Sequence, residues 1–199
     1  MIVLSIGCKG PQVLGVDKVQ DNLIIKNMYL KDIEIRELDA KTDTVNLEDY
    51  DKVHRKKIFE LLAANQVITP MDKYRASLIL QHTAGKICEG QLVSMSAENY
   101  LLAFHLSSAA LGQLKLNSDT TTIKKNNIPR MVALNYDRYL LFTKGFQKFG
   151  TQFVFDENGA MLLAPVDSTL SNDEERKEYN VQPLSLLLSR YKMKAMPAE

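Results

Sequence analysis

The chain has 199 residues, of which 45% are hydrophobic and 25% are charged, and its formal net charge is +1. A chain of this length can bury a sizeable core without a metal or a disulfide, and it is too apolar and too weakly charged to be intrinsically disordered. The near-neutral charge argues against a broad nucleic-acid-binding surface, which requires clustered basic residues. We therefore expect no nucleic-acid partner.

The cysteines and the apolar segments indicate the cellular compartment in which the protein is expected. Cys8 and Cys88 form no zinc-type or redox motif, which fits a reducing compartment, with one long-range disulfide as the alternative. No apolar run approaches the roughly 18 residues that cross a bilayer, so we expect no membrane span. Residues 1–18 are predicted to form an N-terminal arm or strand. Their apolar start, which ends in Gly7 and Cys8, makes a clipped lipoprotein signal the alternative. We therefore expect a cytoplasmic protein by default, with an exported or lipid-anchored form as the minority alternative.

Hydrophobic periodicity predicts a single mainly α-helical domain over residues 19–199. The apolar spacing favours a first helix at about 19–38, followed by a polar connector at 39–46. Start and stop signals predict four more helices: one capped by Asn46, one opened by Thr69 and Pro70 and closed by Gly85 or Gly90, one at about 96–113, and one from Pro129 to Gly145.

After the fifth helix the pattern changes. Two apolar runs that flank a turn signal predict a β-hairpin at about 151–164. Short helices are expected after the capping pattern at 171–174 and from Pro183. The predicted fold therefore has about five helices packed as repeat-like helix hairpins, one C-terminal β-hairpin and short terminal helices. No strict repeat period appears, so a long solenoid is not expected.

Several polar residues on the apolar helices could carry chemistry. Gln81 and His82 end the third helix, His105 lies within the fourth, and Asp137 and Arg138 interrupt the fifth. Neighbours on a helix point about 100° apart, so Asp137 and Arg138 need separate partners. A buried charge without a partner is costly.

The turn between the fifth helix and the hairpin is also polar. It contains Gln147, Gly150, Thr151 and Gln152. Gly150 allows a positive φ or a close backbone approach, and each amide offers a donor and an acceptor. Such a turn could hold a ligand, or it could only satisfy backbone groups where the helix gives way to the hairpin.

The order of these residues resembles an uncharacterised bacterial family, a domain of unknown function. Its members share Q-H, D-R and Q-x-[YF]-G-T-Q motifs in this order, which here read Gln81-His82, Asp137-Arg138 and Gln147 to Gln152. The likeness continues in the segments at 163–167 and 173–176, and more loosely in Asp32, Arg36 and Asp51. It covers about residues 30–190. The resemblance implies candidate positions, but no reaction or ligand.

Our hypothesis places one polar pocket where the helical body meets the hairpin, lined by His82, Asp137, Arg138, Gln147, Thr151 and Gln152. His82 would act as a general acid or base, Asp137 would orient it or pair with it, and Arg138 would hold an anion. Gln81, His105 and Gly150 complete the candidate ligand-binding residues. The protein would then be a cofactor-independent hydrolase or transferase acting on a nucleotide, a phosphate ester or a sugar.

Each candidate also has a structural interpretation. His82 could bond a carbonyl, His105 could be a core or interhelical histidine, and Arg138 could tie the fifth helix to Gln152 or to the first helix. Asp32 and Arg36, four residues apart, are most simply an intrahelical ion pair.

The alternative function is a non-catalytic protein-interaction module, with a partner-binding groove formed by the alanine-rich fourth helix and the helix hairpins. A metal site from His82, His105 and Asp137 has no H-x-x-x-H spacing to support it. We therefore expect no metal and no cofactor, and a small polar or anionic ligand or a protein as the partner.

Overall fold

A computed structural model describes residues 19–42, 46–88, 91–94 and 96–196, so the predicted arm at 1–18 lies outside the described residues. The mainly helical fold is confirmed. The elements are α1 (Leu23–Thr42), α2 (Leu47–Ala63), α3 (Pro70–Gln81), β1 (Gly85–Cys88), β2 (Gln91–Ser94), α4 (Glu98–Leu116), α5 (Thr120–Lys125), α6 (Ile128–Lys144), β3 (Phe153–Phe155), β4 (Met161–Leu163), α7 (Asp173–Glu178) and α8 (Leu184–Arg190).

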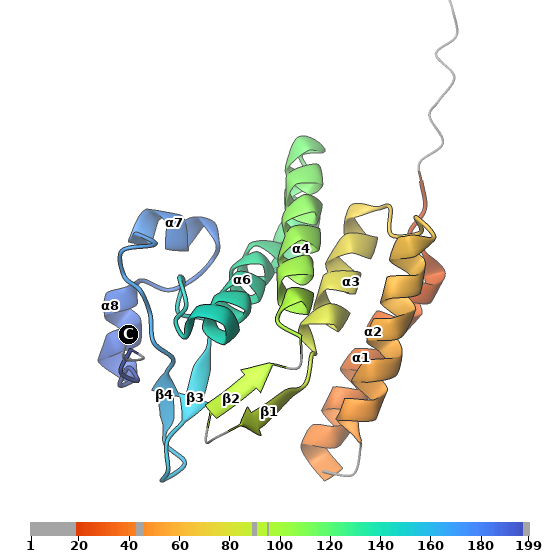
Figure 1. Cartoon of the computed structure of the whole chain (residues 1–199). Helices are drawn as coiled ribbons and strands as arrows, with labels where there is room; N and C mark the ends of the chain where they lie inside the picture. Colours follow the sequence, from red (N-terminus) through yellow and green to blue (C-terminus); the bar gives the residue numbers. More distant parts are fainter. Residues whose placement is uncertain (1–18, 43–45, 89–90, 95, 197–199) are drawn as a thin grey trace, which may run out of the picture.

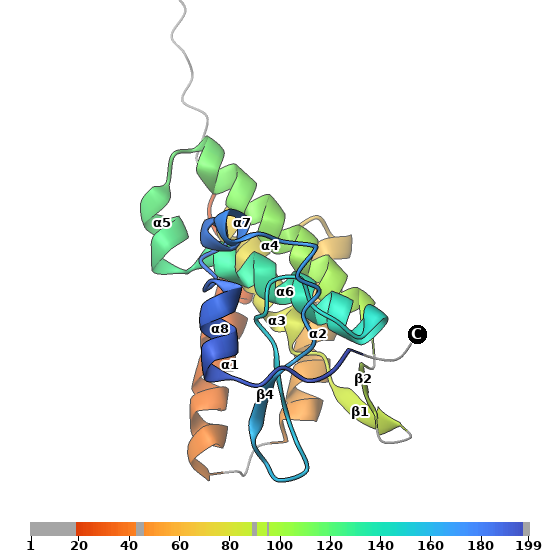
Figure 2. The same cartoon turned by 90° about the vertical axis from the view of Figure 1, so that its left-hand side faces the viewer.

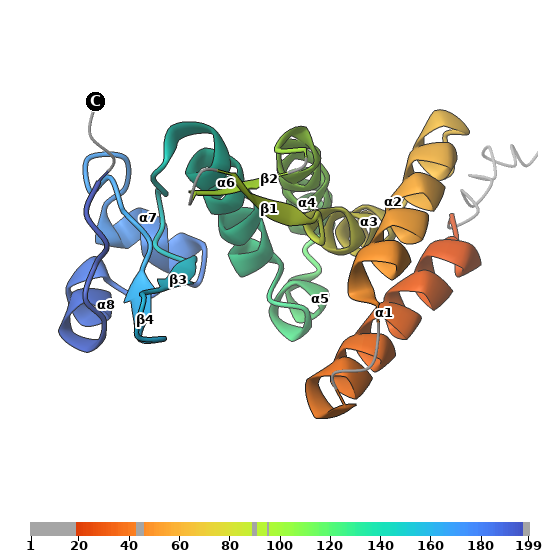
Figure 3. The same cartoon turned by 60° about the horizontal axis from the view of Figure 1, so that its bottom comes forward.

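The helices follow one another across the molecule in chain order. The α1–α2 hairpin lies at one end, α3, α4 and α6 lie side by side in the middle, and the C-terminal strands and short helices form the other end (Figure 1 and Figure 3). Seen from the C-terminal end, α5 stands beside α4 on the opposite side from the β1–β2 hairpin (Figure 2). No helix of the described residues is long and apolar enough to cross a membrane.

Local signals place the helix ends as predicted in three cases. The Asn46 side chain accepts a hydrogen bond from the backbone of Asp49 and caps α2. Thr69 and Asp72 form a reciprocal capping box at the start of α3. Gly145, with a φ of +78°, ends α6 in the left-handed conformation that glycine adopts without strain.

Three boundaries differ from the prediction. α1 extends through Thr42, across residues predicted as a connector, because its inward stripe continues past Leu38 with half-buried Asp39. α3 ends at Gln81, since Gly85 begins a strand instead of closing the helix. The antiparallel β1–β2 hairpin, which pairs Gly85 with Ser94, was not predicted, and neither was α5. The predicted C-terminal hairpin is confirmed as β3 paired with β4.

The core runs through the middle of the helix row. α4 lies between α3 and α6, and its Ala103 and Ala110 are completely buried. Small side chains at these positions let neighbouring helices approach closely. These two alanines of α4 therefore pack inside the protein and do not line a partner groove.

The antiparallel α1–α2 hairpin has an apolar half and a polar half. Ile25 near the start of α1 and Ile58 near the end of α2 are both fully buried in one cluster with α3. The opposite half contains Asp32 of α1 and Asp51 of α2, close to the C-terminal end of α3. This polar half brings charged groups together beside His82.

Candidate functional site

Asp137 is bound to the turn that follows its own helix. It is fully buried, and its Oδ1 accepts hydrogen bonds from the backbone N–H groups of Lys148 and Phe149, each at 2.8 Å. Its Oδ2 accepts from the backbone N–H of Thr151 at 2.9 Å and from the Thr151 hydroxyl at 2.8 Å. Burial raises the pKa of Asp137, and these hydrogen bonds oppose that rise. The expected pairing of Asp137 with His82 is not what the structure shows.

Gln147 ties the same turn to the C-terminal hairpin. Its Nε2 donates to the backbone oxygens of Gln152 and Ala164, each at 2.9 Å, and its Oε1 accepts from the backbone N–H of Gln152 at 2.8 Å. The side chain is fully buried. The amide is thus occupied by backbone groups, as in the structural interpretation of this residue.

Two further residues close the turn. Gly150 has a φ of +79°, and a Cβ added there would meet Leu187 Cδ1 at 2.9 Å. Arg176 is 1% exposed and donates hydrogen bonds to the backbone oxygens of Phe149 and Lys148. We name this saturated group the turn cluster: Asp137, Gln147, Gly150, Thr151 and Arg176.

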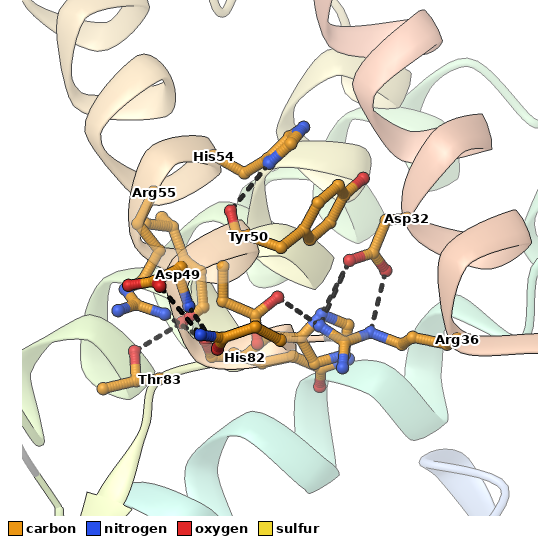
Figure 4. Close-up of polar contacts among 12 residues, drawn as sticks. Asp32, Arg36, Asp49, Tyr50, His54, Arg55, His82 and Thr83 are labelled. Atoms are coloured by element: carbon orange, nitrogen blue, oxygen red, sulfur yellow. Dashed lines mark hydrogen bonds and ion pairs between the residues drawn. The ribbon is translucent and has the colours of Figure 1, made fainter. Parts of the chain in front are cut away.

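His82 lies at the end of α3 beside a carboxylate of α1 (Figure 4). Its Nδ1 is 3.3 Å from Oδ1 of Asp32, which is 2% exposed. Nδ1 is buried and makes no hydrogen bond of good geometry within the described residues, so Asp32 is a close charged neighbour of this nitrogen; the His82 side chain as a whole is 16% exposed. Nε2 makes no hydrogen bond to the part of the chain that the structure describes. One ring nitrogen therefore faces Asp32, and the other has no hydrogen-bond partner among the described residues.

Arg36 fixes Asp32 and links it to α2. The Arg36 Nε donates to Asp32 Oδ2 at 3.2 Å, and Nη2 lies 3.2 Å from Asp32 Oδ1, which confirms the predicted intrahelical pair. The same Nη2 contacts Oδ1 of Asp51 at 2.5 Å. We name these four residues the His82 cluster: Asp32, Arg36, Asp51 and His82.

The His82 cluster favours an ionised Asp32 beside a neutral imidazole. Burial lowers the pKa of His82 below its ordinary value, although Asp32 opposes the change. Burial would raise the pKa of Asp32, but its contacts with His82 and Arg36 together outweigh burial and hold that pKa low. Burial raises the pKa of Asp51 despite the opposing charge of Arg36. A neutral His82 beside a carboxylate carries its proton on Nδ1, which leaves the lone pair on Nε2.

Tyr50 lies next to this cluster. Its ring stacks on His54 with the centroids 3.9 Å apart, and its hydroxyl is buried and makes no hydrogen bond to the residues that the structure describes. Burial, with the charge of Asp32, raises the pKa of Tyr50 to about 12. The phenol therefore stays protonated and can donate a hydrogen bond.

Two arginines hold the backbone at the end of α3. Arg138 Nη1 donates to the backbone oxygen of Gln81 at 3.0 Å, and Arg55 Nη1 donates to that of His82. Cations at the last carbonyls of a helix interact favourably with its dipole. Arg138 Nε also donates to Gln152 Oε1 at 3.2 Å, which confirms the predicted tie between α6 and the turn. Both contacts position His82.

The candidate residues therefore form two groups and not one pocket lining. Gln152 joins them, because it accepts from Arg138 and donates to Thr151 Oγ1 at 2.9 Å. The turn cluster is saturated by internal hydrogen bonds. Within the described residues, the His82 cluster and the adjoining Gln81 retain buried polar atoms that make no hydrogen bond, namely His82 Nδ1 and Gln81 Oε1.

No protein-family model, curated protein or solved structure matches this chain.

His105 lies apart from these groups. It is exposed on α4, and its ring packs against the neighbouring Phe104 with the centroids 5.3 Å apart. The expectation of a core or interhelical histidine is wrong, because the ring points to solvent. Among the described residues His105 makes no polar contact with the His82 cluster.

A metal at this place would compete with Arg36. Within the described residues, the one group of three side chains that could hold an ion is Asp32, Asp51 and His82, whose ligand atoms lie within 4.8 Å of one another. Both carboxylates already contact the Arg36 guanidinium. A divalent cation would have to displace Arg36, so the cluster is better described as an ion-pair network.

The sequence reasoning did not assign Asp32 to His82. Helical spacing could have pointed to this contact. Asp32 follows Ile25 by two helical turns and so lies on the buried stripe of α1, where an apolar residue is ordinarily found. A lone acid in such a stripe needs a partner from another element. The polar residues predicted on the other helices, His82 among them, were the candidates for that partner.

Proposed function

We propose that the protein is a cofactor-independent hydrolase or transferase in which His82 acts as a general base on a small polar substrate. The observation that supports this best is the 3.3 Å contact between buried Asp32 and His82 Nδ1, together with the absence of any hydrogen bond between Nε2 and the described residues. A base oriented through one nitrogen and open at the other is the arrangement that proton transfer requires. Asp32 would be the positioning residue.

The low pKa of His82 supports the same role. Burial favours the neutral imidazole, so the group accepts a proton near neutral pH without first having to lose one. Arg36 keeps Asp32 ionised and fixed in position. Tyr50 could donate a hydrogen bond to a developing negative charge, since its hydroxyl is buried and unpartnered.

The test is a panel of chromogenic nitrophenyl carboxylic esters, phosphate esters and glycosides. We expect turnover of one substrate class, and a loss of at least about 100-fold in kcat/KM in His82→Gln. Asp32→Asn should lower kcat more than it raises KM and should move the acidic limb of the pH profile. His105→Gln, a change of the same kind at an exposed position, should leave turnover unchanged.

The proposal fails if no class is turned over, or if turnover survives in His82→Gln. A purely structural role of Asp32 would lower the melting temperature without moving the pH profile. Folding of each variant is monitored by circular dichroism, so loss of activity can be separated from loss of structure.

A second candidate function rests on a different surface. The outward face of α1 exposes Leu23 (69%), Leu30 (52%) and Leu38 (46%), which fits a protein-interaction module. This alternative predicts no turnover in the panel, together with self-association or partner binding that Leu30→Glu removes.

A further inference from the structure

Arg138 is a cation without an acidic partner. Its hydrogen bonds go to two neutral oxygens, the backbone oxygen of Gln81 at 3.0 Å and the amide oxygen of Gln152 at 3.2 Å. No carboxylate of the described residues lies within ion-pair distance of its guanidinium. By contrast, Arg36 contacts two carboxylates. Arg138 therefore has no carboxylate counterion among the described residues, and its charge faces only neutral oxygens and the negative end of the α3 dipole.

The surroundings make this charge costly. Burial lowers the pKa of Arg138, and the positive charge of Arg36 lowers it further, with only the Tyr100 phenol opposing. Asp32 and Asp51 are engaged with Arg36 and do not offset the charge of Arg138. A partly buried cation close to a second cation is stabilised by an anion.

The Arg138 guanidinium also has N–H donors that make no hydrogen bond to the described residues. Nε and Nη1 each make one protein hydrogen bond, whereas Nη2 makes none to the described residues. The side-chain oxygen of the adjoining Gln81 is buried and accepts no hydrogen bond from the part of the chain that the structure describes. Near residue 81, one donor of Arg138 and one acceptor of Gln81 therefore have no hydrogen-bond partner among the described residues.

We propose that Arg138 binds the phosphate group of the substrate, so that the substrate class is a phosphate ester. The proposal rests on the proposed function, because it places this phosphate next to His82, whose backbone neighbour Gln81 is bonded to Arg138. A guanidinium without a carboxylate partner, with its planar fork of donors, is suited to a phosphate group, which offers several charged oxygens. The unpartnered Gln81 oxygen would accept a hydrogen bond from a hydroxyl of the same ligand.

The test uses inorganic phosphate as the probe, with sodium chloride added to keep ionic strength constant, and measures binding by calorimetry and by the shift in melting temperature. Gln152→Glu places a carboxylate where the Arg138 Nε already donates, and so supplies the missing counterion. We expect the wild type to bind phosphate and Gln152→Glu to bind it at least about tenfold more weakly. Arg138→Lys should weaken binding similarly, because it loses the fork of donors.

The matched control is Gln113→Glu. Gln113 accepts a hydrogen bond from Lys73 at 2.8 Å on the exposed side of α4, so this change also sets a carboxylate beside a cation, but away from Arg138. It should leave phosphate affinity within about twofold of the wild type. The inference is overturned if phosphate has no effect beyond that of chloride, or if Gln152→Glu binds it as tightly as the wild type.

One variant separates this inference from the proposed function. His82→Gln keeps Arg138 and should still bind phosphate. Phosphate binding without His82-dependent turnover would retain the inference and reject the proposed function. Turnover that depends on His82, without phosphate binding, would retain the proposed function and reject the phosphate site at Arg138.

Discussion

Asp32 of α1 and His82 at the end of α3 are far apart in the chain, yet their Oδ1 and Nδ1 atoms lie 3.3 Å apart. The carboxylate is 2% exposed, and it is also bonded to Arg36. An acid this deeply buried, held by one cation and facing one imidazole, gives His82 a defined orientation. The predictions below test that relationship and the separate structural role of the turn cluster.

The first prediction concerns stability against pH. The pKa of His82 is below its ordinary value of 6.5 in the folded protein, so between these two values the unfolded chain binds more protons. The free energy of unfolding should therefore fall as the pH is lowered through 6.5 and towards the folded pKa. His82→Gln should show a flatter dependence over pH 5 to 7.5.

Urea unfolding of both proteins at several pH values measures this difference. Comparison of the two curves removes the titration of the groups that lie away from His82, whereas Asp32 still differs between the two proteins because His82 helps to hold its pKa low. A steeper fall in His82→Gln than in the wild type would show that protonated His82 stabilises the fold.

The second prediction concerns Asp137→Asn. Asp137 accepts four hydrogen bonds, two on each oxygen, and an amide nitrogen cannot accept those of backbone N–H groups. We expect a loss of about 3 kcal/mol in the free energy of unfolding. Chemical denaturation measures it, with exposed Glu157→Gln as the control. A loss close to that of the control would contradict a structural role for Asp137.

The third prediction compares two glycines that share a positive φ. Gly150 and Gly159 have φ values of +79° and +77°, but a Cβ at Gly150 would meet Leu187 whereas a Cβ at Gly159 would meet nothing within 4 Å. Both alanine variants should lose about 1 kcal/mol from the backbone alone. Gly150→Ala should lose roughly a further 1 kcal/mol from the contact with Leu187. Equal melting temperatures of the two variants would disprove tight packing at Gly150.

Helix boundaries were predictable where short-range chemistry decides them. The Thr69 cap and the left-handed Gly145 depend on a few neighbouring residues, and both were predicted from the sequence, although the reciprocal bond from Asp72 was not. The β1–β2 hairpin was not, because its four-residue strands interrupt a helical sequence and carry little pattern. Gly85 was therefore read as a helix end.

The candidate site was predicted only in part. The order of the polar motifs in the sequence predicted Gln81, His82, Asp137 and Arg138 as site residues. It could not show which acidic residue faces the His82 imidazole. That choice depends on how the α1–α2 hairpin packs on α3, which brings Asp32 and not Asp137 to His82. Asp137 is held by backbone groups of a turn, and side-chain identities do not reveal those contacts.

The most direct test of the central claim is the protonation state of His82, read from the side-chain ¹⁵N chemical shifts of both ring nitrogens at pH 7.5. We predict a neutral ring with the proton on Nδ1, directed at Asp32, and a change towards the Nε2-protonated form in Asp32→Asn. A wild-type ring that is doubly protonated, or that carries its single proton on Nε2, would contradict the role of His82 as a base oriented by Asp32.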